Sequence, residues 1–267
     1  VSFTEHGNKV TLMSLLQTKS LVVNMAEKPI CTNFDFELQA GEYWGVLGGN
    51  GIGKTTLLNT LAGLRPAAGG EIFINGKSLR EWKRKHMARK LGMLFQDSVD
   101  TFPTTVRETA MIGRHPYVSF LSVEAKQDRD IVNSALADVS LNEVPDRQID
   151  TLSGGERRRL ALATLLVQDP LIWLLDEPTN HLDLHHQISM LNLIKEKVEK
   201  NKGAALMVLH DVNLVIRFCT HALLMIEHDN IVCGPVADVL NQENLQILYQ
   251  HPIKKVEADG SSFFFPE

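Results

Sequence analysis

The chain has 267 residues, of which 44% are hydrophobic and 22% charged, and a formal net charge of −5. These values are typical of a globular protein with one large domain, or one domain with a subdomain, and the charge does not favour a nucleic-acid partner. The longest apolar stretch, Leu160 to Leu175, is interrupted by Gln168, Asp169 and Pro170, so it is shorter than the ~20 residues that span a bilayer.

The N-terminus and the cysteines indicate a compartment. The first residues lack the basic-then-apolar pattern of a signal peptide. Cys31, Cys219 and Cys233 have neither the spacing of a metal site nor that of a disulfide framework, which favours a reducing cytosol. We therefore expect any membrane association to come through a partner protein.

The first part of the chain is patterned as short strands. Residues 1–20 are weakly patterned and are expected to form a loose extension or an edge strand. Residues 21–38 alternate between apolar and polar side chains, as in a half-exposed antiparallel sheet. The apolar run 43–47 predicts a buried strand, and residues 71–74 followed by Asn75-Gly76 predict another strand and its turn.

The middle of the chain is predicted to be mostly helical. Residues 78–90 are typical of a helix that ends in a basic cluster, which we interpret as a solvated face in preference to a docking patch. Residues 91–95 predict a short buried strand that runs into Gln96. Helical periodicity then dominates three segments, 105–114, 124–140 and 155–168. Residues from about 97 to 168 are therefore expected to be a helical insertion.

The last third of the chain alternates between strands and helices. Strands are predicted at 171–175, 204–209, 222–226 and 231–233, helices near 184–199 and 212–218, and two short helices near 236–249. This alternation implies a parallel sheet with right-handed crossovers. We therefore predict one α/β domain over 1–267, in which about 1–96 and 169–267 form the core and a β-subdomain, and about 97–168 a helical subdomain.

A phosphate-binding loop is indicated between the strand at 43–47 and a helix predicted over 56–62. The spacing G-x-x-x-x-G-K-[ST] is satisfied by Gly48, Gly53, Lys54 and Thr55. A glycine-rich turn in this context directs N–H groups and the positive end of a helix dipole at an anion. The predicted nucleotide-binding residues are Gly48, Gly49, Asn50, Gly51, Ile52, Gly53, Lys54, Thr55 and Thr56. Lys54 is expected to reach the β- and γ-phosphates, and the Thr55 hydroxyl to ligate Mg²⁺.

An acidic pair, Asp176 and Glu177, follows the apolar strand at 171–175. An open α/β sheet has its site at the carboxyl ends of its strands. Asp176 is therefore expected to hold Mg²⁺, and Glu177 to polarise an attacking water. The alternative interpretation is that the pair only caps the next helix.

A second anion site is indicated by Leu152-Ser153-Gly154-Gly155-Glu156, which opens the helix predicted over 155–168. Ser153 as N-cap and Glu156 three residues later have the spacing of a capping box. Capping explains the serine and the glutamate but not the two glycines between them. A hydroxyl, glycine N–H groups and a helix N-terminus together favour binding of an anion.

Taken together, these motifs resemble those of the ATP-binding cassette (ABC) family, and the resemblance covers nearly the whole chain. The other matching motifs are Gln96 after Leu-Gly-Met-Leu-Phe, Thr179-Asn180-His181-Leu182-Asp183, and His210 in Val-Leu-His-Asp. The resemblance implies an α/β P-loop NTPase with a RecA-like parallel-sheet core, an N-terminal antiparallel β-subdomain and an inserted helical subdomain. It also implies ATP hydrolysis with Mg²⁺, in which Glu177 is the catalytic base, Gln96 contacts Mg²⁺ and the attacking water, and His210 contacts the γ-phosphate.

The same resemblance implies a homodimer that holds each ATP between its two copies. One face of ATP would meet Lys54 and Thr55, and the other Ser153 and Gly155 of the partner subunit. Gly154, Glu156 and Asp183 are expected beside the nucleotide in the same arrangement. The family stacks adenine on an aromatic residue, whereas the register anchored on Pro29-Ile30 places Met25 there; a thioether offers dispersion contact but no ring.

A narrower resemblance concerns transport. The segments Thr105-Val-Arg-Glu, Ile112-Gly-Arg-His-Pro-Tyr117 and Leu184-His-His-Gln187 are similar to those of ATPase subunits of ferric-siderophore, haem and cobalamin importers. This implies two transmembrane permease subunits that dock near 97–117, an indirect partnership with a periplasmic or surface substrate-binding protein, and a peripheral location on the cytoplasmic face of the inner membrane. Three alternatives stay open: the ATPase of an exporter or lipid transporter, a soluble cassette protein acting on ribosomes or Fe–S assembly, and a non-hydrolysing nucleotide-binding module.

Overall fold

The computed structural model describes residues 14–26, 28–96, 103–118, 126–227, 229–258 and 260–267. The predictions made for 1–13, for 97–102 and for the start of the helix expected from residue 124 lie outside the described residues. Two sheets and a C-terminal hairpin contain the described strands. The larger sheet carries the candidate site, so its construction determines where the functional side chains lie.

An antiparallel sheet comes first in the chain, as predicted. It has the order β2-β1-β4-β5 and comprises β1 (Ser14–Met25), β2 (Lys28–Gln39), β4 (Gly69–Ile74) and β5 (Lys77–Ser78). Phe34, Phe36 and Leu38 are buried while the residues between them are exposed, because successive side chains of a strand point to opposite faces. The first strand extends back to Ser14, so the end of the segment 1–20 is part of this sheet.

The second sheet is the core of the fold. Its order is β10-β9-β3-β8-β7-β6, from β3 (Tyr43–Gly48), β6 (Leu91–Leu94), β7 (Ile172–Leu175), β8 (Ala204–Val208), β9 (His221–Glu227) and β10 (Asn230–Pro235). All neighbouring pairs are parallel except β9 with β10. This arrangement confirms the predicted parallel sheet.

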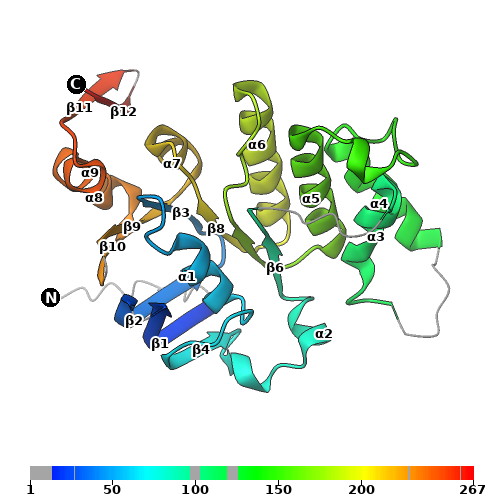
Figure 1. The fold of residues 1–267 in the computed structure, drawn as a ribbon, viewed down its shortest axis with the longest axis horizontal. Coiled ribbons are helices and arrows are strands. Elements are labelled where there is room, and N and C mark those ends of the chain that lie inside the picture. Colours follow the sequence, from blue (N-terminus) through cyan, green and yellow to red (C-terminus); the bar gives the residue numbers. More distant parts are fainter. Residues whose placement is uncertain (1–13, 27, 97–102, 119–125, 228, 259) are drawn as a thin grey trace, which may run out of the picture.

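Both faces of the core sheet are covered, which explains the uninterrupted apolar runs of its strands. On β7, Trp173 and Leu175 belong to the hydrophobic cluster shared with α5 (Gly154–Gln168) and α6 (Leu184–Lys200). Ile172 and Leu174 point the other way, into the cluster shared with the antiparallel sheet and α1 (Lys54–Leu61). Figure 1 shows this layering, with α6 and α7 (Val212–Phe218) on one side of the strands and α1, β1 and β2 on the other.

Helices occupy the middle of the chain, as predicted. They include α3 (Val106–Met111), the 3₁₀ turn η2 (Ile112–Arg114), α4 (Lys126–Asp138) and α5, and Figure 1 shows α3, α4 and α5 side by side at one end of the molecule. The division into a core and a helical subdomain stays a prediction. The last third adds α7 (Val212–Phe218), α8 (Val236–Val239) and α9 (Gln242–Tyr249). Within the ranges described, no helix is both long and apolar enough to cross a membrane.

The prediction of one continuous helix over 78–90 is wrong. The structure has the 3₁₀ turn η1 (Leu79–Glu81) and the four-residue α2 (Arg84–Met87), separated by Trp82 and Lys83 with extended backbone (ψ 130° and 131°). Trp82 packs against the second hydrophobic cluster, and this tertiary contact interrupts the helix.

The basic cluster in this segment is largely exposed, in line with the predicted solvated face: Lys83, Arg84, Lys85 and His86 are exposed. Two of its cations also contact the backbone of another segment. Lys85 donates to the Val118 carbonyl at 2.5 Å, and Arg89 donates to the Pro116 carbonyl at 2.7 Å. Two cations of the cluster therefore hold the backbone that follows η2.

A C-terminal hairpin is absent from the sequence prediction. It consists of β11 (Ile253–Ala258) and β12 (Ser261–Pro266), paired antiparallel. The buried Phe264 joins the cluster of α7 and α9, and the Asn213 side chain bonds both the N–H and the carbonyl of Phe264. The hairpin is thus held to the core by contacts across 51 positions of the chain.

Candidate active site

The phosphate-binding loop lies between β3 and α1, as predicted. Gly51 and Gly53 have φ of 74° and 111°, a backbone conformation that side chains disfavour. A Cβ at Gly53 would lie 2.5 Å from Cδ1 of Ile30, so space also requires glycine there. Because α1 begins at Lys54, the glycine turn opens onto the positive end of the helix dipole, which is the arrangement that binds phosphate.

Lys54 closes this loop. Its ammonium donates to the carbonyls of Gly48 at 2.8 Å and Gly49 at 2.9 Å. Burial lowers the pKa of Lys54, while the carboxylates of Glu177 and Asp176 oppose that effect. The side chain is therefore a buried cation next to two acids, placed where a phosphate would meet it.

Asp176 follows directly after β7, and its N–H donates to the Leu94 carbonyl at the end of β6. The residue is buried, and neither carboxylate oxygen has a hydrogen bond of standard geometry among the described residues. Burial raises the pKa of Asp176, and the nearby Thr55 hydroxyl partly offsets the rise. Buried carboxylate oxygens without a hydrogen bond of standard geometry are costly, and a bound cation would remove that cost.

Glu177 is the centre of a polar cluster. Its Oε1 lies 2.8 Å from Nε2 of His210, and its Oε2 accepts from the side-chain amides of Gln96 at 3.2 Å and Asn180 at 3.0 Å. The backbone of Glu177 has φ of 50°, a strained conformation for a residue other than glycine and one that concentrates at functional sites. The Glu177 side chain is only 10% exposed, so the three partners of its carboxylate determine where it points.

One cavity of about 480 Å³ joins these groups. It is lined by Met25, Asn50, Gly51, Gly53, Lys54, Thr55, Thr56, Gln96, Glu177, Asn180 and His210. Met25 lies at the end of β1 and faces the cavity, as the predicted register requires. Asn180 is the site residue that the sequence prediction missed, although it belongs to the recognised segment 179–183.

The residues predicted around Ser153 do not line this cavity. Ser153 caps α5 by accepting from the N–H of Glu156, and Glu156 reaches back to the N–H of Ser153. A Cβ at Gly155 would lie 3.4 Å from Cδ2 of Leu182, so this turn lies against the segment 179–183 of its own chain. Asp183 caps α6 by accepting from the N–H of His186.

Glu156 provides a test of this capping network. The Arg147 guanidinium and the N–H and hydroxyl of Ser153 lower the pKa of Glu156 from 4.5 to about 2. The stabilisation is therefore complete above pH 4.5 and is lost as the pH falls towards 2. We expect Glu156→Gln to flatten the fall in unfolding free energy over this interval, measured by urea unfolding. Glu143→Gln, at an exposed position outside the network, should leave the slope unchanged; an equal flattening there would contradict the assignment.

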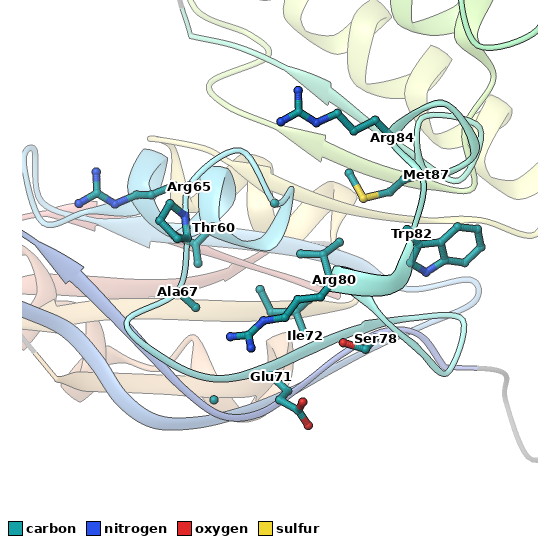
Figure 2. A pocket seen from close by; sticks show the side chains of 14 residues that line it. Thr60, Arg65, Ala67, Glu71, Ile72, Ser78, Arg80, Trp82, Arg84 and Met87 are labelled. Carbon is teal, nitrogen blue, oxygen red and sulfur yellow. The ribbon is translucent and has the colours of Figure 1, made fainter.

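A second cavity, of about 300 Å³, lies between α1, β4 and the segment from η1 to α2. Figure 2 shows Arg65, Arg80 and Arg84 around it, with the Met87 side chain between Arg84 and Trp82. None of the residues that line it belongs to the predicted motifs. Residues of the phosphate-binding loop, with Gln96, Glu177 and His210, line the other cavity instead.

Comparison with known proteins agrees with this geometry. The family model described as "ABC transporter" matches residues 31–180. The chain is 32% identical over 235 residues to the ferric enterobactin transport ATP-binding protein of Escherichia coli (strain K12), covering 88% of this chain and 86% of that protein. It is 38% identical over 235 residues to the hemin import ATP-binding protein of Nocardia farcinica, covering 87% and 80%.

A solved structure described as an inward-facing, metal-chelate type ABC transporter superimposes with a TM-score of 0.81 at 25% identity, over 95% of this chain and 98% of the other. The family match includes the phosphate-binding loop, Ser153 and Glu177, and the relatives extend it over most of the chain. The chain belongs to the ABC transporter family of ATP-binding proteins.

Proposed function

We propose that this chain is the ATP-hydrolysing motor subunit of a membrane importer for an iron chelate, either a ferric siderophore or haem. The names of the E. coli and N. farcinica relatives, which concern enterobactin and hemin, support this substrate class. Cobalamin stays a prediction from the sequence resemblance. ATP hydrolysis is supported above all by the cluster of His210, Gln96 and Asn180 around the Glu177 carboxylate.

Phosphoryl transfer requires mainly positioning and charge stabilisation. Glu177 would accept the proton of the attacking water, because its carboxylate faces the cavity that contains Lys54 and Thr55. His210 and Gln96 hold the two carboxylate oxygens of Glu177 and would contact the γ-phosphate and the water. Lys54 would leave the carbonyls of Gly48 and Gly49 for the phosphates.

The residues around Asp176 fit Mg²⁺. Two buried carboxylate oxygens without a hydrogen bond of standard geometry in the described chain lie near the Thr55 hydroxyl, and oxygen ligands suit this ion. Thr55, Asp176 and Gln96 would hold it. When bound, Mg²⁺ would neutralise charge that develops on the phosphates.

The proposed assembly is a homodimer bound to two permease subunits on the cytoplasmic face of the membrane, with a substrate-binding protein as an indirect partner. In the dimer, Ser153, Gly154 and Gly155 of one protomer would meet the ATP held by Lys54 of the other, with Glu156 and Asp183 capping the helices behind this contact. Support comes from the separation of the Ser153 turn from the cavity of its own chain. Met25 would contact the adenine without stacking.

The test is phosphate release by the assembled complex in membranes. We expect hydrolysis that requires Mg²⁺ and is stimulated by the binding protein loaded with a ferric siderophore or haem. Stimulation by the unloaded binding protein alone, or transport in the outward direction, would contradict the importer assignment. Absence of phosphate release from a folded complex that binds ATP would contradict the enzymatic assignment and favour a non-hydrolysing module.

A further inference from the structure

A buried arginine, Arg158, lies on α5 just after the capping box of Ser153. Only 6% of its surface is exposed. Its guanidinium donates to backbone carbonyls in two separate segments, 95–96 and 176–178. The acceptors are Phe95, Gln96 at 3.3 Å, Asp176, Glu177 at 2.6 Å and Pro178 at 3.1 Å.

The two segments are those that carry the functional side chains. Residues 95–96 follow β6 and place Gln96, and residues 176–178 follow β7 and place Glu177. Burying a charge is costly unless hydrogen bonds satisfy it, and a guanidinium offers five N–H donors in a rigid planar fork. Arg158 therefore fixes the two segments relative to each other through one rigid group.

The same contacts explain how Glu177 keeps its strained backbone. Three consecutive carbonyls, from Asp176 to Pro178, converge on the guanidinium. The residue at the centre of this turn, Glu177, has φ of 50°. A conformation of this kind persists only where its surroundings hold it, and hydrogen bonds to the carbonyls on both sides of the Glu177 Cα do so here.

We infer that Arg158 is a positioning residue for hydrolysis. It holds the backbone segments of Gln96 and Glu177 in register, and it ties both to the helix whose N-cap is Ser153. This inference rests on the proposed function as an ATPase. Because Arg158 does not line the cavity, its loss would disturb the reacting geometry more than the binding of ATP.

The neighbouring Arg159 provides a matched control. It lies on the same helix, is partly buried and also donates to two backbone carbonyls, those of Val139 at 3.0 Å and Ser140 at 3.3 Å. Those carbonyls follow α4 and belong to no predicted motif. Arg158→Met and Arg159→Met therefore remove the same chemical group from one helix. Arg158→Met removes it next to the segments that carry Gln96 and Glu177, and Arg159→Met removes it away from them.

The experiment measures kcat and KM for ATP, with thermal unfolding, in the complex with the permease. We expect Arg158→Met to lower kcat about 10- to 100-fold, as for a displacement of ~1 Å at the reacting groups, with KM within about threefold of wild type. Arg159→Met should keep kcat within about twofold. Arg158→Lys, which keeps the charge but fewer donors, should recover part of the lost kcat.

Several results would overturn the inference. One is a kcat of Arg158→Met within about twofold of wild type. Another is a raised KM for ATP with an unchanged kcat. Equal losses of kcat in both methionine variants would show a merely structural role. If Arg158→Met does not fold, Arg158→Lys decides: an unchanged melting temperature with lowered kcat supports the inference, and an unchanged kcat refutes it. A wild-type complex that releases no phosphate would refute the proposed function and this inference with it.

Discussion

Replacement of Glu177 by Gln is expected to lower kcat for ATP hydrolysis about 100- to 10,000-fold, the contribution of a general base, while ATP still binds. The amide keeps the shape of the side chain and can still meet His210 and Asn180, but it cannot accept a proton from water. Because hydrolysis would reopen the dimer, the variant should also trap the closed, ATP-bound dimer. Phosphate release and size-exclusion chromatography with ATP measure the two effects.

The chain offers a matched control for this substitution at Glu42. The Glu42 side chain is also largely buried, with 15% exposure, and its carboxylate also lies near a histidine, His221, at 3.7 Å. It accepts from the backbone of Gln39 and the indole of Trp44 and does not line the ATP cavity. Glu42→Gln should therefore leave kcat nearly unchanged. Turnover in Glu177→Gln as fast as in Glu42→Gln would remove Glu177 from the role of base.

Replacement of Ser153 by Arg is expected to cause the second large effect, a loss of turnover far greater than the loss of ATP binding. Ser153 does not line the cavity of its own chain, so ATP binding by one protomer should persist. A long cationic side chain at this turn would block the surface that completes the partner's site. ATP binding by fluorescence titration and phosphate release by the complex separate the two quantities.

Mixed dimers distinguish a site shared between copies from a site within one chain. When a Lys54→Ala protomer pairs with a Ser153→Arg protomer, one shared site has both defects and the other has none. Single-turnover hydrolysis should therefore return in the mixed dimer, although each variant fails alone. Absence of recovery would contradict the shared site.

Ser153→Arg also removes a helix cap, and Asn241→Arg is the control for that effect. Asn241 caps α9 through the N–H of Asn244, far along the chain from the phosphate-binding loop. This substitution should lower stability without the loss of turnover. If it slows hydrolysis as much as Ser153→Arg, the effect at Ser153 is one of folding alone.

Local patterns were sufficient to predict much of this protein. The spacing from Gly48 to Thr55 determines a turn followed by a helix N-terminus, because glycine conformations and helix dipoles are properties of short segments. The apolar run at 171–175 likewise predicts a buried strand with Asp176 and Glu177 at its end. The parallel sheet follows from the alternation of strands and helices, and most of the predicted site residues follow from these motifs.

Tertiary contacts decided the rest. Trp82 ends the helix predicted over 78–90 by packing against the second hydrophobic cluster, and Asn213 holds the C-terminal hairpin across 51 positions; neither contact leaves a periodic pattern in the sequence. The hydrogen bonds of Glu177 to Gln96, and of Arg158 to the carbonyls of both segments, span 81 and as many as 63 positions. The sequence by itself determined which chemical groups are present and the local turns that carry them. Only the packed sheet, which brings the ends of β6, β7 and β8 to one edge, decided that these groups meet around one carboxylate.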